Sequence, residues 1–127
     1  MIKITYDLFQ ELGIPMRMYG AVYLMDVVRY CIKDPSLMDA VYGRLYPKVA
    51  ELYPVQPRAI EKAIRIAIEA AFAKGDAEVL YRLCGDSVNP EKAKLTNKHF
   101  IKVLVEEVQR RMKQEELEGG KPPLENI

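Results

Sequence analysis

The sequence predicts an all-α fold of about six helices packed as an orthogonal bundle. Apolar residues recur at three- and four-residue steps through most of the chain, which is the period of an amphipathic helix. No segment shows the alternation that a ladder of strands requires. The 127 residues, half of them hydrophobic, suffice for one core but not for two. We therefore expect one helical domain over residues 1–114 and a flexible tail over residues 115–127, which is acidic and then rich in glycine and proline.

Turn and capping residues bound the first helices. A helix over residues 5–12 should end at Gly13 and Pro15, and a second helix over residues 20–33 should end before Pro35. Ser36 is a suitable N-cap for a third helix that runs towards Pro47.

Two further helices are expected in the second half of the chain. Gly75 caps the helix before it, so a short fifth helix should occupy residues 76–84 and a polar connection residues 85–95. Thr96 or Asn97 then caps a long final helix. Its apolar stripe is formed by Phe100, Ile101, Val103, Leu104, Val108 and Met112.

Between these regions, residues 46–74 contain two amphipathic patterns joined by a proline-bracketed turn, which is typical of a helix-turn-helix. The first pattern covers residues 46–53, and residues 54–57 break it. Pro57 suits the first position of the next helix, because its φ is preset and its missing N–H would have no helical partner there. The second helix should bury a stripe formed by Ile60, Ala63, Ile64, Ala67, Ile68, Ala71 and Phe72.

The opposite face of this second helix carries the residues that we predict to read DNA bases. A cationic helix face fits the major groove, where arginine and lysine bind guanine acceptors and glutamate accepts from cytosine N4. The predicted base-reading residues are Arg58, Glu61, Lys62 and Arg65. Residues predicted to contact the DNA backbone are Lys48, Gln56, Lys94, Asn97 and Lys98, the last three at the start of the final helix, where free N–H groups favour phosphate.

A solvated face on an ordinary core helix would show the same pattern, so the distribution of charge matters. The net charge is only +1. Residues 44–75 contain six basic and three acidic residues, a local charge of +3, which leaves −2 for the remainder. The positive charge is therefore concentrated at the helix-turn-helix, which favours an encounter with phosphate and predicts modest affinity for a single copy.

Catalytic, metal and membrane functions have no support in the sequence. There is no glycine-rich phosphate loop, nucleophile elbow or metal-ligand spacing, and His99 is the only histidine, so we expect no enzyme activity, no cofactor and no metal. The acidic pairs at residues 106–107 and 115–116 should point different ways on an exposed helix. Cys31 and Cys84 lie in apolar helical contexts, which favours buried reduced thiols. The absence of a long apolar run predicts a cytoplasmic protein.

Five blocks of sequence carry a resemblance to a known family. They are Gly13, Ile14 and Pro15; Gly20, Tyr23 and Leu24; Leu45, Tyr46 and Pro47; AIEKAIRIAIEAAFAKG at residues 59–75; and AKLTNKHFI at residues 93–101. In order and at compatible spacing, they resemble the C-terminal effector domain of stage 0 sporulation protein A, the response regulator that starts endospore formation. The resemblance spans about residues 4–113.

This resemblance implies a six-helix DNA-binding domain of a two-component transcription regulator, whose recognition helix reads a short promoter element, often in tandem copies. The implied partners are double-stranded promoter DNA and an RNA polymerase sigma factor, the latter through residues 75–85. It also implies that copies pair mainly on DNA. In the family a phosphoacceptor receiver precedes this domain, so the chain is either an excised domain or a free-standing relative.

The departures from the family pattern lie on the face that should touch DNA. Ala59 stands at the family's first arginine, and Arg58 is one position earlier, about 100° around the helix. Lys62 replaces an arginine and lacks its bidentate fork. Ile66 replaces a histidine. We therefore expect DNA binding at a site that differs from the family's consensus.

Two other functions stay open at the level of sequence. Ala59, Ile66 and the low net charge are compatible with a helical protein-interaction adaptor that has lost specific DNA recognition. A regulatory domain associated with an enzyme is the second alternative. Salt dependence separates the first from a DNA-binding protein, because each neutralised phosphate weakens DNA binding by roughly 0.9 log units per log unit of salt.

Overall fold

The computed structural model describes residues 1–75, 77–85 and 97–119, and within these ranges the chain is helical with no strand. The α-helices are α1 (Ile2–Leu12), α2 (Tyr19–Lys33), α3 (Tyr46–Ala50), α4 (Pro57–Lys74), α5 (Ala77–Cys84) and α6 (Asn97–Gly119). A 3₁₀ helix, η1 (Pro35–Ala40), and a π-helical segment, η2 (Val41–Leu45), join α2 to α3. The predicted all-α fold is confirmed.

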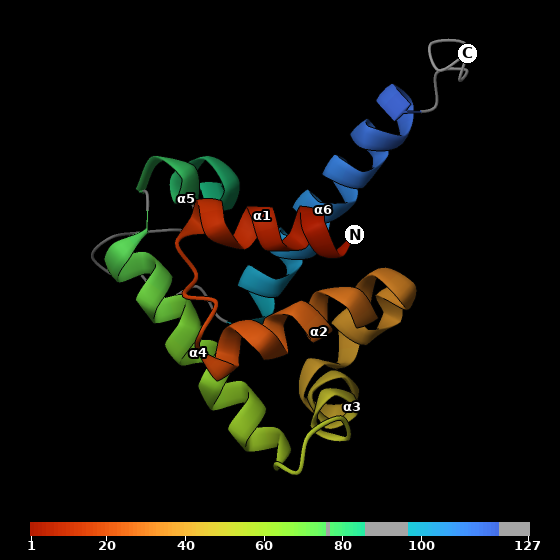
Figure 1. Cartoon of the computed structure of the whole chain (residues 1–127). Helices are drawn as coiled ribbons and strands as arrows, with labels where there is room; N and C mark the ends of the chain where they lie inside the picture. Colours follow the sequence, from red (N-terminus) through yellow and green to blue (C-terminus); the bar gives the residue numbers. More distant parts are fainter. Residues whose placement is uncertain (76, 86–96, 120–127) are drawn as a thin grey trace.

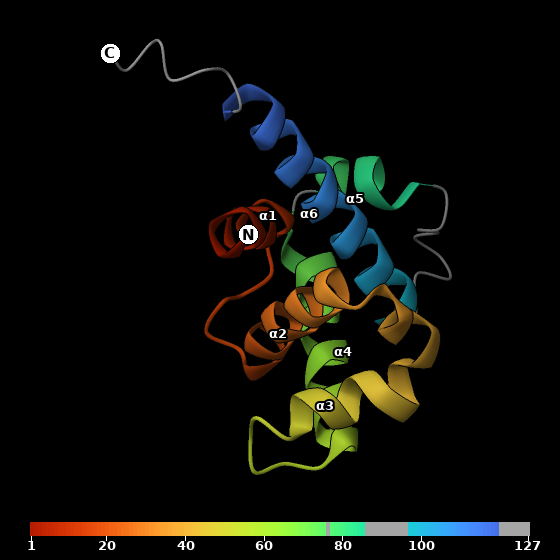
Figure 2. The same cartoon turned by 90° about the vertical axis from the view of Figure 1, so that its right-hand side faces the viewer.

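Helix α2 is the central element of the fold. It packs against α1, α3, α4, α6 and η1. Figure 1 shows α1 on one side of α2 and α4 crossing near its N-terminal end, and Figure 2 shows α6 running beside α1 and α2. The C-terminal part of α6 extends away from the body of the molecule in both views. The packed part of the fold therefore surrounds α2 on several sides.

The core consists of the apolar stripes that the helical period predicts. In α4, Ile60, Ile64, Ala67, Ile68 and Ala71 are buried, while Ala63 and Phe72 are partly buried. In α6, Phe100, Ile101, Leu104 and Val108 are buried, and Val103 and Met112 pack against the core. Both predicted stripes are confirmed. Burial of such side chains contributes about 1.5 to 3 kcal/mol each, which is the main driving force for the bundle.

Close helix contacts depend on glycine at two places. A Cβ atom at Gly20 in α2 would lie 2.0 Å from the carbonyl oxygen of Ala63 in α4, so the two helices touch backbone to backbone. A Cβ atom at Gly75 would lie 2.3 Å from the carbonyl oxygen of Leu12. Gly13, which ends α1 with φ of 76°, lies against Gly75. These contacts set the position of α4 relative to α1 and α2.

The connection between α2 and α3 differs from the prediction. Asp34, not Ser36, caps the segment that follows: its Oδ1 accepts from the backbone N–H of Ser36 at 3.1 Å, and Pro35 takes the first helical position. Residues 35–45 form a 3₁₀ helix and a π-helical segment instead of one regular helix. The predicted cap was therefore wrong by two residues.

The bounds of two other segments also differ. Helix α3 ends at Ala50 and not at residue 53, because the N–H of Tyr53 bonds to Ala50 three residues back, and the proline at 54 disfavours the α conformation before it. Helix α6 continues to Gly119, so residues 115–119 belong to the helix and not to a tail. The predicted polar connection at 85–95, apart from Gly85, and the remaining tail residues lie outside the described ranges.

Candidate nucleic-acid interface

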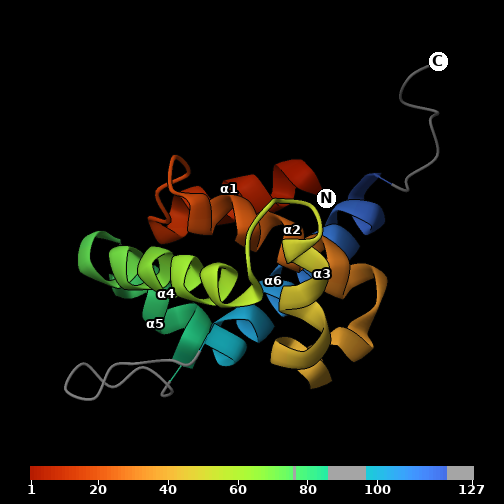
Figure 3. The same cartoon turned by 90° about the horizontal axis from the view of Figure 1, so that it is seen from below.

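Helices α3 and α4 form the helix-turn-helix. Figure 3 shows α4 along one face of the molecule, with α3 beside its N-terminal end. Pro57 occupies the first position of α4, and Gln56 before it has the extended backbone of an N-cap residue, with φ −83° and ψ 152°. The sequence prediction that α4 begins at this proline is confirmed.

The outer face of α4 carries an exposed cationic row. Arg58, Lys62 and Arg65 are all exposed. Their spacing of four and three residues places them within about 60° of one another around a 3.6-residue helix. The buried stripe lies on the opposite side. All four predicted base-reading residues therefore share one side of α4, with Glu61 at its edge and half-buried.

Glu61 and Arg65 are joined by an ion pair. Nη1 of Arg65 donates to Oε1 of Glu61 at 3.0 Å, and the side chains are 50% exposed for Arg65 and 22% exposed for Glu61. An exposed pair at this helical spacing contributes only about 0.3 to 0.5 kcal/mol. Its cost of separation is small compared with a bidentate contact to a base, which is worth about 1 to 3 kcal/mol. The pair is therefore weak enough to separate when another acceptor binds Arg65.

Two of the three departures from the family pattern on α4, Ala59 and Ile66, have different surroundings. Ile66 is 42% exposed, so this position is on the surface although the residue is apolar. Ala59 is only half-exposed and lies about 100° from Arg58. Arg58, by contrast, continues the row of Lys62 and Arg65.

The predicted backbone contacts surround α4 on two sides. Lys48, in α3, is exposed, and its Nζ lies 5.2 Å from the ring centroid of Tyr30. Gln56 is exposed at the N-cap, and its side chain makes no capping hydrogen bond. Lys98 is exposed in the first turn of α6. Lys94 lies outside the described residues.

Asn97 differs from the other predicted backbone contacts. Its side chain is not offered to solvent: the residue is 6% exposed, and Nδ2 donates to the carbonyl oxygen of Glu61 at 3.1 Å. A phosphate contact needs an accessible donor, whereas this donor is already used inside the protein. The structure therefore assigns Asn97 to the junction between α6 and α4.

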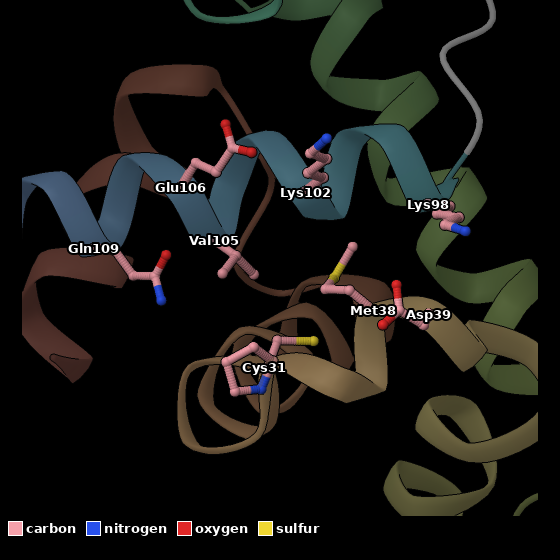
Figure 4. A pocket seen from close by; sticks show the side chains of 9 residues that line it. Cys31, Met38, Asp39, Lys98, Lys102, Val105, Glu106 and Gln109 are labelled. Atoms are coloured by element: carbon pink, nitrogen blue, oxygen red, sulfur yellow. The ribbon is translucent and has the colours of Figure 1, made fainter.

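A groove of about 380 Å³ lies between the end of α2, η1 and α6 (Figure 4). Its lining includes Cys31, Met38 and Val105, together with Lys98 and Lys102 one turn apart on α6. Figure 4 shows Lys98 at the end of the groove where α6 meets α4. The start of α6 thus places an exposed cation next to α4.

Polar contacts between α2 and the turn were missed by sequence reasoning. The hydroxyl of Tyr53 donates to Asp26 in α2, and Arg29 pairs with the same carboxylate at 2.9 Å. The Tyr53 ring also meets the ring of Tyr23 edge to face, with 4.9 Å between centroids. Burial, and then the bond to Asp26, raise the pKa of Tyr53 to about 12. These contacts fix the turn that precedes α4. An acidic residue in the largely apolar pattern of α2 was the available signal.

A second polar cluster joins α1 to α6. Glu107 is only 9% exposed and accepts hydrogen bonds from Arg110 and Arg111, and Arg111 also pairs with Glu11 of α1. The arginine hydrogen bonds lower the pKa of both Glu107 and Glu11. The expectation that Glu107 lies on an exposed face was therefore wrong, because the residue is buried beside two arginines, one of which also pairs with α1.

The cysteines are located as predicted. Cys31 and Cys84 are free and buried, and burial raises the pKa of each thiol to about 11. In the ranges that the structure describes, no helix combines the length and apolar character needed to cross a membrane.

An all-helical domain whose helix-turn-helix exposes a cationic second helix has the architecture of DNA-binding regulatory domains. Residues 5–108 match the family model described as Sporulation initiation factor Spo0A C terminal. Because this match covers most of the chain, the protein belongs to that family, which is a family of DNA-binding effector domains of a sporulation response regulator and not an enzyme family.

Proposed function

We propose that this chain is a sequence-specific transcription regulator that reads promoter DNA by placing α4 in the major groove. The observation that carries the proposal is the outer face of α4, where Arg58, Lys62 and Arg65 are exposed while the opposite face is buried. A helix held by its inner face and exposing side chains that bind bases meets the geometric requirement of a recognition helix.

The side chains on this face have different roles in the proposal. Arg65 forms a bidentate contact to guanine, and Glu61, 3.0 Å from it, accepts from the N4 group of a neighbouring cytosine. Lys62 supplies a point charge without the planar fork, so it discriminates guanine less strictly than an arginine would. Arg58 extends the row towards the N-terminal end of α4. Ile66 is placed to contact a thymine methyl group.

Contacts to the DNA backbone come from the two sides of α4. Lys48 of α3, Gln56 at the N-cap and Lys98 of α6 are exposed at the appropriate positions, and Lys94 is retained in this group from the sequence alone. Asn97 is left out because its amide is used inside the protein. A small number of cations predicts modest affinity for a single copy, which favours binding of paired copies to tandem elements.

Family membership supports a proposal about a further partner and about location. We propose that the surface around residues 75–85 contacts an RNA polymerase sigma factor, and that the protein acts in the cytoplasm, where promoter DNA is found. Tyr81 and Arg82 of α5 are exposed and are available for such a contact.

Selection of bound duplexes from a random pool at two salt concentrations tests the proposal. We expect enrichment of a short motif that contains guanine and cytosine, with affinity that falls by roughly 0.9 log units per log unit of salt for each phosphate contact. The alternative function is a protein-interaction adaptor, and the observation that favours it is the exposed apolar side chain of Ile66 on the outer face of α4. Undetectable binding to every duplex at about 50 mM salt would establish that alternative over DNA recognition.

A further inference from the structure

The first residue of α6 lies at a junction of three helices of the DNA-binding unit. Asn97 is 6% exposed, and its Nδ2 donates to the main-chain carbonyl of Glu61 in α4 across a sequence separation of 36 residues. Tyr46, the buried aromatic residue at the start of α3, has its hydroxyl next to the Asn97 amide without forming a hydrogen bond to it. Helices α3, α4 and α6 therefore meet at this side chain.

The partner of the Asn97 amide is the backbone of a proposed base-reading residue. Glu61 holds Arg65 through its side chain at 3.0 Å, while its carbonyl oxygen accepts from Asn97 at 3.1 Å. The residue after Asn97 is Lys98, which is exposed and is proposed to contact phosphate. One hydrogen bond thus connects the turn of α4 that reads bases to the turn of α6 that contacts the backbone.

We infer that Asn97 is a positioning residue for sequence recognition: through the Glu61 carbonyl it sets the depth and rotation of α4 relative to the phosphate contact made by α6. This inference rests on the proposed function. Base readout requires side chains to meet base edges within hydrogen-bond geometry, whereas phosphate contacts tolerate small displacements. Loss of the bond should therefore reduce specificity more than general affinity for DNA.

Two substitutions separate this role from simple helix capping. Asn97→Leu has nearly the same size and no charge, but it cannot donate a hydrogen bond. Asn97→Asp also cannot donate, yet its carboxylate is favoured at the N-terminus of a helix and preserves the cap. If Asn97 only capped α6, Asn97→Asp would behave like the native protein. If Asn97 positions α4, both variants should lose specificity for the preferred DNA sequence.

The experiment titrates the full chain with the best duplex from the selection and with a mixed-sequence duplex, and urea unfolding of each variant reports stability. The readout is the dissociation constant for the mixed-sequence duplex divided by that for the selected duplex. Partial unfolding or the added charge weakens binding to both duplexes alike and leaves this ratio unchanged. We expect this ratio to fall about fivefold or more in both variants, the discrimination lost when one base pair is misread. The salt slope for the mixed duplex should not change.

Lys98→Gln is the matched control on the adjacent residue. It should reduce the salt slope by roughly one phosphate contact and leave the ratio unchanged. A ratio that stays within about twofold of the native value in Asn97→Asp or Asn97→Leu overturns the inference, whatever the effect on stability. A native protein that shows no preference between the duplexes overturns the proposed function, and this inference with it.

Discussion

The backbone contact between α2 and α4 makes Gly20→Ala a strong test of the packing that positions the recognition helix. The added Cβ would lie 2.0 Å from the carbonyl oxygen of Ala63 and 2.8 Å from the Cβ of Ala67. Ordinary contact begins at 3.4 Å, so α2 and α4 must separate by roughly 1 Å or more. No side-chain rotation relieves this overlap, because the nearest atom belongs to the backbone.

The expected change in stability follows from two opposing terms. Overpacking costs about 1 to 3 kcal/mol or more, and replacing glycine by alanine within a helix returns up to about 1 kcal/mol. We expect the free energy of unfolding in urea to fall by about 2 kcal/mol. Gly43→Ala is the matched control, since a Cβ there meets nothing within 4 Å, and it should be neutral or slightly stabilising. Equal stabilities for the two variants would refute the close contact between α2 and α4.

Three further predictions test the faces of the helices and the polar cluster. Ile64→Ala should lower the free energy of unfolding by about 2 to 5 kcal/mol, because the side chain is buried. Ile66→Ala, at an exposed position, should change it by less than about 0.5 kcal/mol. Similar losses in the two variants would mean that α4 is rotated about its axis relative to this assignment. Lys62→Ala and Arg65→Ala should weaken duplex binding and retain the native circular dichroism, and a parallel loss of helicity would contradict their assignment to the outer face. Glu107→Gln should cost about 1.5 to 3 kcal/mol at pH 7. The folded pKa of Glu107 lies below its ordinary value of 4.5, so the native carboxylate stabilises the fold above about pH 4.5 and loses this effect as the pH falls. The Glu107→Gln variant should therefore lose less stability in acid than the native protein. An identical dependence of stability on pH would argue against the buried pair.

Most of the helical structure could be predicted from sequence because it depends on local information. The stripe of α4 repeats every three to four residues, and Pro57 marks its start, so both the helix and its buried face were predicted correctly. The segment between α2 and α3 was less accessible to this reasoning. Asp34 and Ser36 are both good capping residues, and the choice between them depended on which side chain could reach the free N–H groups after Pro35.

In the candidate site too, features that depend on neighbouring residues were predicted, and contacts between residues distant in the sequence were not. Arg58, Lys62 and Arg65 were placed on the outer face from their spacing, and the structure exposes all three. Their binding to DNA remains a prediction. The spacing of Asn97 and Glu61 carries no such information, because they are separated by 36 residues. The free N–H groups expected at the start of α6 predicted a phosphate contact there, but they did not show that the Asn97 side chain points inward.

The sequence by itself determined which residues form helices, which face of each helix is apolar, and that the positive charge lies on the helix-turn-helix. These properties follow from neighbours within about four positions along the chain, which interact as soon as a helix forms. Only the tertiary structure decided that Gly20 touches Ala63, that Arg111 of α6 pairs with Glu11 of α1, and that Asn97 holds the backbone of Glu61. Each of these contacts joins residues or surfaces from different helices, and their geometry exists only after the helices have packed together.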